Sequence, residues 1–349
     1  MKLTAFTIFM VIILIKVSFS FQLQKADTIV IASWNLENLF DTTDDPGKND
    51  FEFTPEGRKQ WTQERLDKKL YNLSRVIRIM NADRGPDILG VVEVEHESLL
   101  DSMINKYLSD KDYKVAYAES PDRRGIDNGL IYRKGKFKLL DVKTDTIHLP
   151  DNYPTRLILN VNLLDSKGDT LIFFVNHWPS RIGGVEKSEP NRIAAASTLR
   201  KNVDNYLKHN PSAKIFILGD FNDEPSNSSI LSELDAESFL CDSIQYSNDS
   251  EVKTHNTLYN CSYFAFQEGE GTYKYRSDWN LLDQIIVSDN VITGNKINYI
   301  CNSFTIFKPN FIITHSGKYE GTPFPTYGGN RYLGGYSDHF PVYAKFTSQ

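Results

Sequence analysis

The sequence is poor in cysteine. Only three cysteines occur among 349 residues, Cys241, Cys261 and Cys301, and their spacing matches no zinc site. In an oxidising compartment they would permit one disulfide and leave one thiol over, and the sequence does not indicate which pair forms. A metal centre built on thiolates is therefore not expected.

The chain also lacks an apolar run of the ~20 residues that a transmembrane helix needs. The apolar stretch at residues 5–15 is stopped by Lys16, and Ser18 is one of two small residues suited to a cleavage site. These features are typical of a secretory signal peptide. We predict that residues 1–20 are removed and that the mature chain is exported, to the periplasm or the extracellular space.

Excess positive charge is missing as well. The full chain has 39 basic and 45 acidic residues, and loss of residues 1–20 leaves 37 against 45. This argues against a broadly basic nucleic-acid binder, although an acidic enzyme can act on phosphates when metal ions supply positive charge. No repeat, low-complexity tract or proline-rich linker occurs. We expect one compact domain over residues 21–349, acting as a monomer without an obligate protein partner.

Regular elements follow from the apolar spacing. Residues 54–80 and 191–207 have helical spacing, the first with Thr54 as N-cap and Pro55 at N1. Residues 156–178 read as a hairpin around the turn Ser166–Asp169. Short continuous apolar runs, typical of strands covered on both faces, lie at residues 87–92, 214–218 and 284–287. We predict an α/β fold with a mixed sheet or a pair of sheets and helices outside.

Two long segments, residues 256–279 and 316–336, are rich in tyrosine, phenylalanine and glycine. Long loops in a compact domain are usually functional or mobile. Their aromatic side chains could stack on bases, bind sugars or simply pack.

Polar residues stand where the buried-looking strands end or begin. They are Asn35, Glu93, Asn176, His177, Asp220, Asn222, Asp283, Asp338 and His339. Each could be an ordinary polar strand end, but a buried carboxylate usually meets a cation or a hydrogen-bond network. If the sheets bring these ends to one rim, the oxygen-rich ligand set suits Mg²⁺, Mn²⁺ or Ca²⁺. A hard cation in a cleft suggests a phosphate ligand.

Six short motifs occur in an order that is similar to one known family. They are WN at Trp34-Asn35, VEVE around Glu93, NHW at His177, GDFND at Asp220–Asp223, LDQIIVS at Asp283 and SDHFPV at Asp338-His339. The chain resembles the endonuclease/exonuclease/phosphatase family of the DNase I-like superfamily. That resemblance implies a four-layer α/β sandwich, with two mixed β-sheets packed face to face, helices on the outer faces and the active site on one rim.

The resemblance implies a metal site formed by Glu93, Asn35 and Asp338. Mg²⁺ is the expected ion, with Mn²⁺ and Ca²⁺ as alternatives. Neighbouring residues of an extended chain point to opposite sides, so Asp338 and His339 need a bend to enter one site. The preceding pair Gly334-Gly335 could provide that freedom.

The resemblance also implies the acid–base residues. Asp283 would orient His339, and Asp220 would orient or deprotonate the attacking water. Asn222 would hold a phosphate oxygen. His177 would stabilise the phosphorane-like state or protonate the leaving oxygen.

Two arginines are candidates for binding substrate phosphate. Arg124 precedes a predicted strand at residues 129–133, and Arg181 follows His177 in the same loop. The alternatives are surface ion pairs for Arg124 and an ordinary loop position for Arg181.

The function expected from these observations is a secreted, divalent-metal-dependent phosphodiesterase that hydrolyses phosphoester bonds, with DNA or RNA as the first substrate. A phospholipid or inositol-phosphate hydrolase is the alternative among enzymes. From another class, the alternative is an inactive binding module on the same fold. The presence of Glu93, Asp220 and His339 argues against the inactive module.

Overall fold

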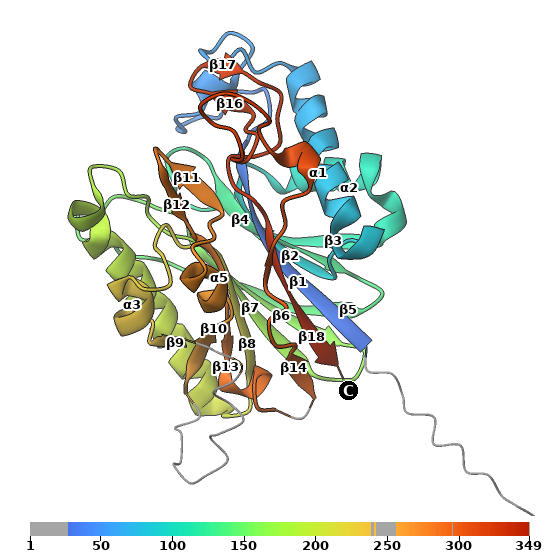
Figure 1. Ribbon diagram of the computed structural model, residues 1–349, viewed down its shortest axis with the longest axis vertical. Helices are drawn as coiled ribbons and strands as arrows, with labels where there is room; N and C mark the ends of the chain where they lie inside the picture. The colour runs from blue at the N-terminus through green and yellow to red at the C-terminus, as the bar shows by residue number, and fades with distance from the viewer. Residues whose placement is uncertain (1–26, 239–240, 242–255, 295, 349) are drawn as a thin grey trace, which may run out of the picture.

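The computed structural model describes residues 27–238, 241, 256–294 and 296–348. The predicted signal peptide lies outside the described residues. Two large β-sheets pack face to face, and helices cover their outer faces (Figure 1). This arrangement confirms the predicted four-layer α/β sandwich. No helix within the described residues is long and apolar enough to cross a membrane.

The first sheet has the strand order β14-β18-β1-β2-β4-β3, and β15 also pairs with β18. Its strands are β1 (Asp27–Leu39), β2 (Ile88–Val94), β3 (Tyr113–Ala118), β4 (Asp127–Arg133), β14 (Ile297–Tyr299), β15 (Thr305–Ile306) and β18 (Val342–Ser348). Strands β1 and β2 are parallel, and β18 is antiparallel to β1. The ends of β1 and β2 and the start of β18 therefore meet at one edge.

The second sheet has the order β5-β6-β7-β8-β13-β10-β9. Its strands are β5 (Phe137–Asp145), β6 (Ile158–Asp165), β7 (Thr170–His177), β8 (Lys214–Asp220), β9 (Ala236–Ser238), β10 (Leu258–Asn260) and β13 (Asp283–Ser288). The predicted hairpin is confirmed as β6 and β7. In register, Asp220 pairs with His177 on one side and Asp283 on the other.

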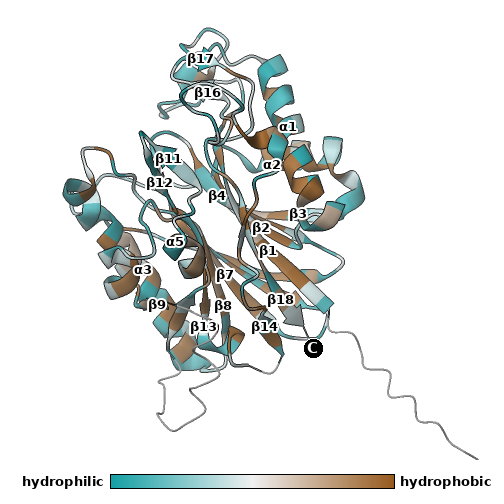
Figure 2. Ribbon diagram, in the orientation of Figure 1, coloured by the Kyte–Doolittle hydropathy of each residue, from teal (hydrophilic) through white to brown (hydrophobic). Residues whose placement is uncertain are grey.

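Apolar side chains fill the space between the sheets, where the strands are brown in Figure 2. The two sheets approach each other closely where β2 carries Gly90. A Cβ atom at this position would collide with the Leu218 side chain and lie 3.4 Å from Val175 of the second sheet. Glycine therefore permits the packing that brings the two strand edges together.

Helices α1 (Gln63–Asp83) and α2 (Glu97–Tyr107) pack on the first sheet, and α3 (Val185–His209) packs on the second (Figure 1). The predicted start of the first helix at Thr54 is wrong. Its N-cap is Thr62, whose side chain accepts the N–H of Arg65. The hydroxyl of Thr54 instead accepts the N–H of Gly57 in a local turn. The chain is therefore not helical after Thr54, and the helix begins only at Gln63.

Smaller elements connect the layers. They are the 3₁₀ helices η1 (Phe51–Phe53), η2 (Ser109–Lys111), η4 (Asp289–Val291) and η5 (Asn310–Ile312), the single π-helical turn η3 (Ser229–Glu233), and the short helix α5 (Tyr263–Gln267). The two aromatic loops contain two-stranded sheets, β11 (Tyr273–Tyr275) with β12 (Asp278–Asn280) and β16 (Tyr327–Gly328) with β17 (Arg331–Tyr332). Both lie toward the upper end of the molecule in Figure 1.

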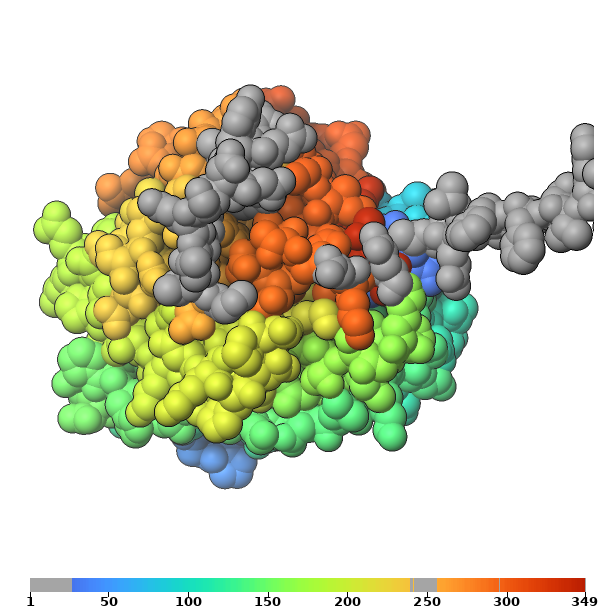
Figure 3. All heavy atoms as spheres, turned by 90° about the horizontal axis from the view of Figure 1, so that it is seen from below, coloured from blue at the N-terminus to red at the C-terminus, as the bar shows by residue number. Residues whose placement is uncertain are grey.

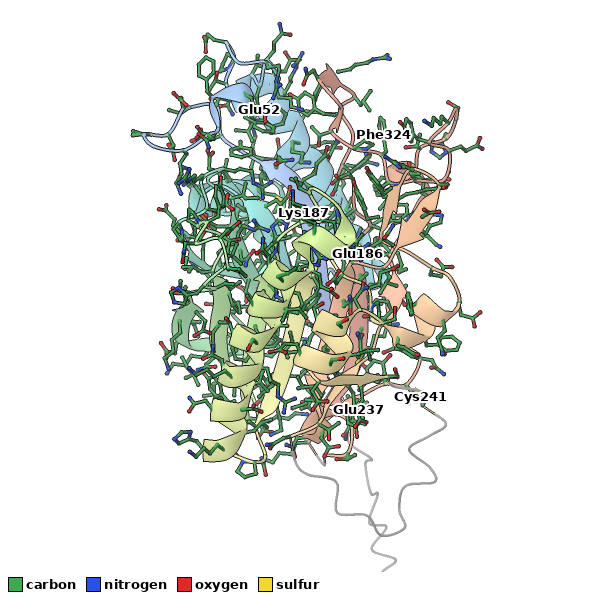
Figure 4. The ribbon with its side chains drawn as sticks, turned by 90° about the vertical axis from the view of Figure 1, so that its left-hand side faces the viewer. Glu52, Glu186, Lys187, Glu237, Cys241 and Phe324 are labelled. Atoms are coloured by element: carbon green, nitrogen blue, oxygen red, sulfur yellow. A yellow bond between two sulfur atoms is a disulfide. The ribbon has the colours of Figure 1, made fainter. Side chains whose placement is uncertain are left out.

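The opposite end is shown in Figure 3, where the segment after α3 lies beside the segment after β13. The Nδ2 group of Asn290 donates to the carbonyl of Pro211 there, at 2.7 Å. Figure 4 shows the α3 side, with Glu186 and Lys187 at the upper start of α3 and Cys241 near the lower end. Cys241 forms a disulfide with Cys301, and Cys261 is a buried free thiol. One pair and one thiol were expected, and the structure identifies the pair.

Candidate active site

Six strand ends from the two sheets bring polar side chains to one edge of the sandwich. The first sheet contributes Asn35 from β1, Glu93 from β2 and His339 from the segment before β18. The second contributes His177 and Asp220 at the ends of β7 and β8, and Asp283 at the start of β13. The expected convergence on one rim follows from the directions of these strands.

Asp220 lies at the centre of this group and is 2% exposed. Asn35 Nδ2 donates to Asp220 Oδ2 at 3.0 Å, and the N–H of Asn222 donates to Asp220 Oδ1 at 2.9 Å. The Nε2 atoms of His177 and His339 each lie 3.8 Å from Asp220 Oδ2. One carboxylate oxygen thus faces two imidazoles and an amide, which is suitable geometry for holding a water molecule between them.

His339 is paired with Asp283 as expected. Its Nδ1 lies 2.7 Å from Asp283 Oδ2, and its carbonyl accepts the indole N–H of Trp34 at 3.0 Å. Burial alone would lower the pKa of His339, but the charges of Asp283 and Asp220 outweigh burial and raise that pKa well above its ordinary value. The ring is therefore an imidazolium at neutral pH, with Nε2 directed toward Asp220.

The pKa of His177 is shifted in the opposite direction to that of His339. Burial, followed by the positive charges of Arg156 and Arg124, lowers the pKa of His177 well below its ordinary value. The neutral ring lies with Nε2 3.7 Å from Glu93 Oε1. The rim therefore holds one charged and one neutral imidazole, which can serve different roles.

The acidic groups of the rim crowd one another. Burial raises the pKa of Asp338 to about 7, opposed by His339 and reinforced by the charges of Glu37 and Glu93. Burial likewise raises the pKa of Asp220 to about 6. Such mutual repulsion is what a divalent cation relieves. The donor chemistry of Glu93, Asp338 and Asn35 fits a hard cation, so the residues suit the expected ion.

The backbone is strained where the metal-site glutamate stands. Glu93 has φ +63°, and its Oε2 accepts the N–H of Asn38 at 2.9 Å. Asn38 and its neighbour Glu37 also have positive φ, +50° and +53°. Left-handed backbone at non-glycine residues costs roughly 1–3 kcal/mol each and clusters at functional sites. Here it turns the carboxylate of Glu93 inward.

The bend at Asp338-His339 depends mainly on a serine. Ser337 Oγ donates to the carbonyl of Asn35 at 2.6 Å and accepts the N–H of His339 at 3.0 Å. Gly334, with φ +72°, turns the chain three residues earlier. The glycine provides the freedom that was expected, and Ser337 closes the bend against β1.

The two candidate arginines differ in their surroundings. The side chain of Arg124 is 46% exposed, and its charge reaches His177. Arg181 donates to the carbonyl of Asn222, to Asn280 and to Asp223. Its guanidinium therefore holds the loop that carries Asn222. Phosphate binding by Arg124 and Arg181 stays a prediction.

Sequence reasoning missed Tyr273, Arg156 and Lys69. The Tyr273 ring stacks on His339 with 4.7 Å between centroids, and burial with the charges of Asp338 and Asp220 raises its pKa to about 12. Its only sequence signal was membership of an aromatic loop. Arg156 is buried and donates to the carbonyl of His177 at 3.2 Å.

Lys69 is 1% exposed and braces the same rim from α1. Its Nζ lies 3.5 Å from Glu37 Oε2 and donates to the carbonyl of Tyr336 at 2.7 Å and to Thr326 Oγ1 at 2.5 Å. Burial lowers the pKa of Lys69, while Glu37 and the acids of the rim oppose that shift. The sequence did contain a signal that Lys69 is buried, because this lysine lies on the apolar stripe of its helix.

The site and the family match define a metal-dependent phosphoester hydrolase. Residues 30–348 match the model of the Endonuclease/Exonuclease/phosphatase family, and the chain belongs to this family. The family resemblance inferred from the motifs is confirmed. No curated protein compared by sequence matches the chain.

Solved structures of similar fold come from several organisms. The human Nocturnin catalytic domain with bound sulfate is 18% identical, with a TM-score of 0.53, covering 92% of this chain and 95% of that one. D. rerio TDP2 complexed with single-strand DNA product is 14% identical, with a TM-score of 0.54, covering 91% and 98%. A Bacteroides thetaiotaomicron mannosyl-6-phosphatase is 14% identical, with a TM-score of 0.55, covering 91% and 99%. At these identities the likeness shows the fold alone.

Proposed function

We propose that this protein is an exported, divalent-metal-dependent phosphodiesterase that hydrolyses nucleic acid by direct attack of water on phosphorus. The observation that carries the hydrolytic chemistry is the position of Asp220 Oδ2, 3.8 Å from the Nε2 atoms of both His177 and His339. A carboxylate between a charged and a neutral imidazole supplies a base, a cation and a hydrogen-bond donor at one point.

Each group then has a defined task. Glu93, Asn35 and Asp338 would hold a divalent ion, which would neutralise charge on the phosphate when bound. Asp220 orients the water and takes its proton as the new P–O bond forms. The imidazolium of His339 is the protonated group that can return a proton to the leaving oxygen.

His177 was given two alternative roles, and its lowered pKa separates them. A neutral imidazole is a weak proton donor at neutral pH, but it can donate one hydrogen bond to a phosphoryl oxygen without adding charge. The proposal therefore assigns His177 to stabilising the phosphorane-like state. Its place 3.7 Å from Glu93 supports a position beside the ion.

The preference for nucleic acid rests on paired cations and rings near the rim. On the β11–β12 hairpin, which also carries Tyr273, the Arg276 guanidinium lies 5.3 Å from the ring of Tyr275, which is 57% exposed. Arg123, next to Arg124 in sequence, lies 4.9 Å from the ring of Tyr153. Such pairs suit a single-stranded polyanion with stacking bases. The likeness to a TDP2 structure with single-strand DNA product supports this choice.

Export is proposed from the sequence of residues 1–20. The disulfide between Cys241 and Cys301 supports it, because such bonds persist in oxidising compartments. We expect cell fractionation to find the protein mainly in the extracellular or periplasmic fraction. Mass spectrometry should show that its N-terminus follows residue 20.

A phospholipid or inositol phosphate is the second candidate substrate. Ile182, in the segment that joins His177 to α3, is 87% exposed, and Val185, the first residue of α3, is 45% exposed. Apolar side chains exposed beside a catalytic rim would suit a lipid surface. Their number is small, so nucleic acid is preferred.

A substrate panel tests the proposal. Purified mature protein is assayed on single-stranded DNA, RNA, sphingomyelin vesicles, inositol phosphates and mannose 6-phosphate, with Mg²⁺ or EDTA, and with His339→Ala as the blank. We expect Mg²⁺-dependent cleavage of DNA or RNA that EDTA and His339→Ala abolish. Turnover confined to the lipids or the small phosphates would refute the nucleic-acid assignment, and no turnover on any substrate would refute the hydrolytic proposal.

A further inference from the structure

A second group of acidic side chains lies beside the rim, in the loop that follows β1. The loop, residues 41–50, contains four aspartates and packs against the end of β2, where Glu95 stands two residues after Glu93. Glu52, just beyond the loop, marks the upper end of the molecule in Figure 4. The acidic loop cluster is defined here as Asp41, Asp45, Asp50 and Glu95. None of its members takes part in the proposed hydrolysis.

The cluster has the spacing of a cation site. One ligand oxygen from each of Asp45, Asp50 and Glu95 lies within 4.8 Å of the other two. Glu95 meets the same condition with Asp41 and His96. Two Ca²⁺–oxygen bonds of roughly 2.3–2.6 Å span about 5 Å, so a single ion can reach the oxygens of this cluster.

Two of the carboxylates are buried with an oxygen left unpaired. Glu95 is 2% exposed and Asp50 is 1% exposed. Glu95 Oε2 accepts the N–H of Asp41 at 2.6 Å, and Asp50 Oδ2 accepts the N–H of Asp45 at 3.0 Å. Glu95 Oε1 and Asp50 Oδ1 have no hydrogen-bond partner among the described residues. Buried, unpaired carboxylate oxygens are costly and point to a ligand at their centre.

The chain supplies no lysine or arginine to neutralise the cluster within its described part. The nearest candidate in the loop, Lys48, donates its Nζ to the carbonyls of Ser120 and Asp122 instead. Among the residues that the structure describes, the basic contact to the cluster is from His96, whose Nε2 lies 3.1 Å from Asp45 Oδ2 while its Nδ1 lies 3.5 Å from Glu119. The negative charge of several buried or half-buried acids is therefore left for an external cation.

We propose that the acidic loop cluster binds one Ca²⁺ ion, separate from the catalytic ion. Carboxylate oxygens drawn from an irregular loop and a strand end suit Ca²⁺, which accepts more ligands and looser geometry than Mg²⁺. The ion ties residues 41–50 to the end of β2. It thereby braces the backbone next to Glu93, and its role is structural.

The test measures thermal unfolding of metal-free protein with Ca²⁺, with Mg²⁺ and with EDTA. The matched control is Glu93→Gln, which weakens the catalytic site and leaves the cluster intact. We expect Ca²⁺ to raise Tm by at least ~3 °C in wild type and in Glu93→Gln alike. Asp50→Asn and Asp45→Asn should lose this rise, while their Tm in EDTA stays at or above that of wild type because a repelling charge is gone.

Calcium stoichiometry gives a second readout that does not depend on how stable a variant is. Isothermal titration of Glu93→Gln with Ca²⁺ should show one site, and the double variant Glu93→Gln with Asp45→Asn should bind at least ~10-fold more weakly. An undiminished Tm rise in both Asp50→Asn and Asp45→Asn would overturn the proposal. So would loss of all Ca²⁺ binding in Glu93→Gln alone, and an equal rise with Mg²⁺ would overturn the assignment to Ca²⁺.

Discussion

Asn35 Nδ2 donates a hydrogen bond to Asp220 Oδ2 at 3.0 Å, joining two residues that are 185 positions apart and belong to different sheets. Asp220 ends β8, and Asn35 lies near the end of β1, just before the register shift against β2, so the bond forms only because the two sheets pack with these regions at the same edge. The amide binds Oδ2, the same oxygen that lies 3.8 Å from the Nε2 atoms of both histidines, while Oδ1 accepts the N–H of Asn222. The contact thus links the packing of the sandwich to the chemistry of its rim.

Replacing Asp283 by asparagine separates catalysis from metal binding. The charge of Asp283 helps to raise the pKa of His339, so its loss lets burial lower that pKa. We expect kcat to fall by ~10²–10⁴-fold, and the limb of the pH–rate profile that reports the imidazolium to move to lower pH. The Mg²⁺ concentration that gives half-maximal rate should change little, because Asp283 is not among the proposed ligands. A large rise in that concentration would place Asp283 at the ion.

Replacing Lys69 by methionine tests the brace behind the rim. The change leaves Glu37 buried without its cation, and it removes the donor to the carbonyl of Tyr336. We expect a loss of ~3–5 kcal/mol in the free energy of unfolding, measured by chemical denaturation. Adding Glu37→Gln should restore part of that loss. Purely additive effects of the two changes would show that Lys69 and Glu37 do not interact.

Asp127 provides a prediction about pH and stability. Burial raises its pKa to about 6, while hydrogen bonds from Ser120 and the hydroxyl of Tyr117 oppose the shift. A carboxyl group whose pKa is higher in the folded state contributes stability below its unfolded pKa of ~3.9, and this contribution is lost as pH rises through about 6.

The substitution Asp127→Asn removes this contribution. The difference in unfolding free energy between wild type and variant should therefore shift by up to ~3 kcal/mol between pH 4 and pH 7, favouring wild type at the acidic end. Denaturant unfolding at several pH values measures it. A difference that is independent of pH would mean that Asp127 titrates normally in the fold.

The rim was predictable because its residues are local features of the sequence. Asp220 and Glu93 each follow a short apolar run. The directions of the strands then place the residues after these runs at the same edge of the sandwich. The α1 start was mispredicted because Thr54 and Thr62 both suit an N-cap, and only the turn at Gly57 excludes the first. The spacing of apolar residues does not reveal a local turn that competes with the helix.

The supporting residues could not be predicted in the same way. Glu37 accepts the backbone N–H groups of Thr326 and Tyr327, almost 290 positions away, and Tyr273 reaches His339 from another loop. These contacts depend on how long loops fold over the edge, which apolar spacing does not specify. Lys69 is the exception, since a lysine on an apolar helix stripe signals a buried partner.

The most direct test of the central claim is the Mg²⁺ dependence of single-stranded DNA or RNA hydrolysis in wild type and Glu93→Gln. We predict that EDTA reduces the wild-type rate to that of His339→Ala and that Mg²⁺ restores it. Glu93→Gln should need at least ~10-fold more Mg²⁺ for half its maximal rate. Hydrolysis that resists EDTA, or an unchanged Mg²⁺ requirement in Glu93→Gln, would contradict the placement of a catalytic ion at this rim.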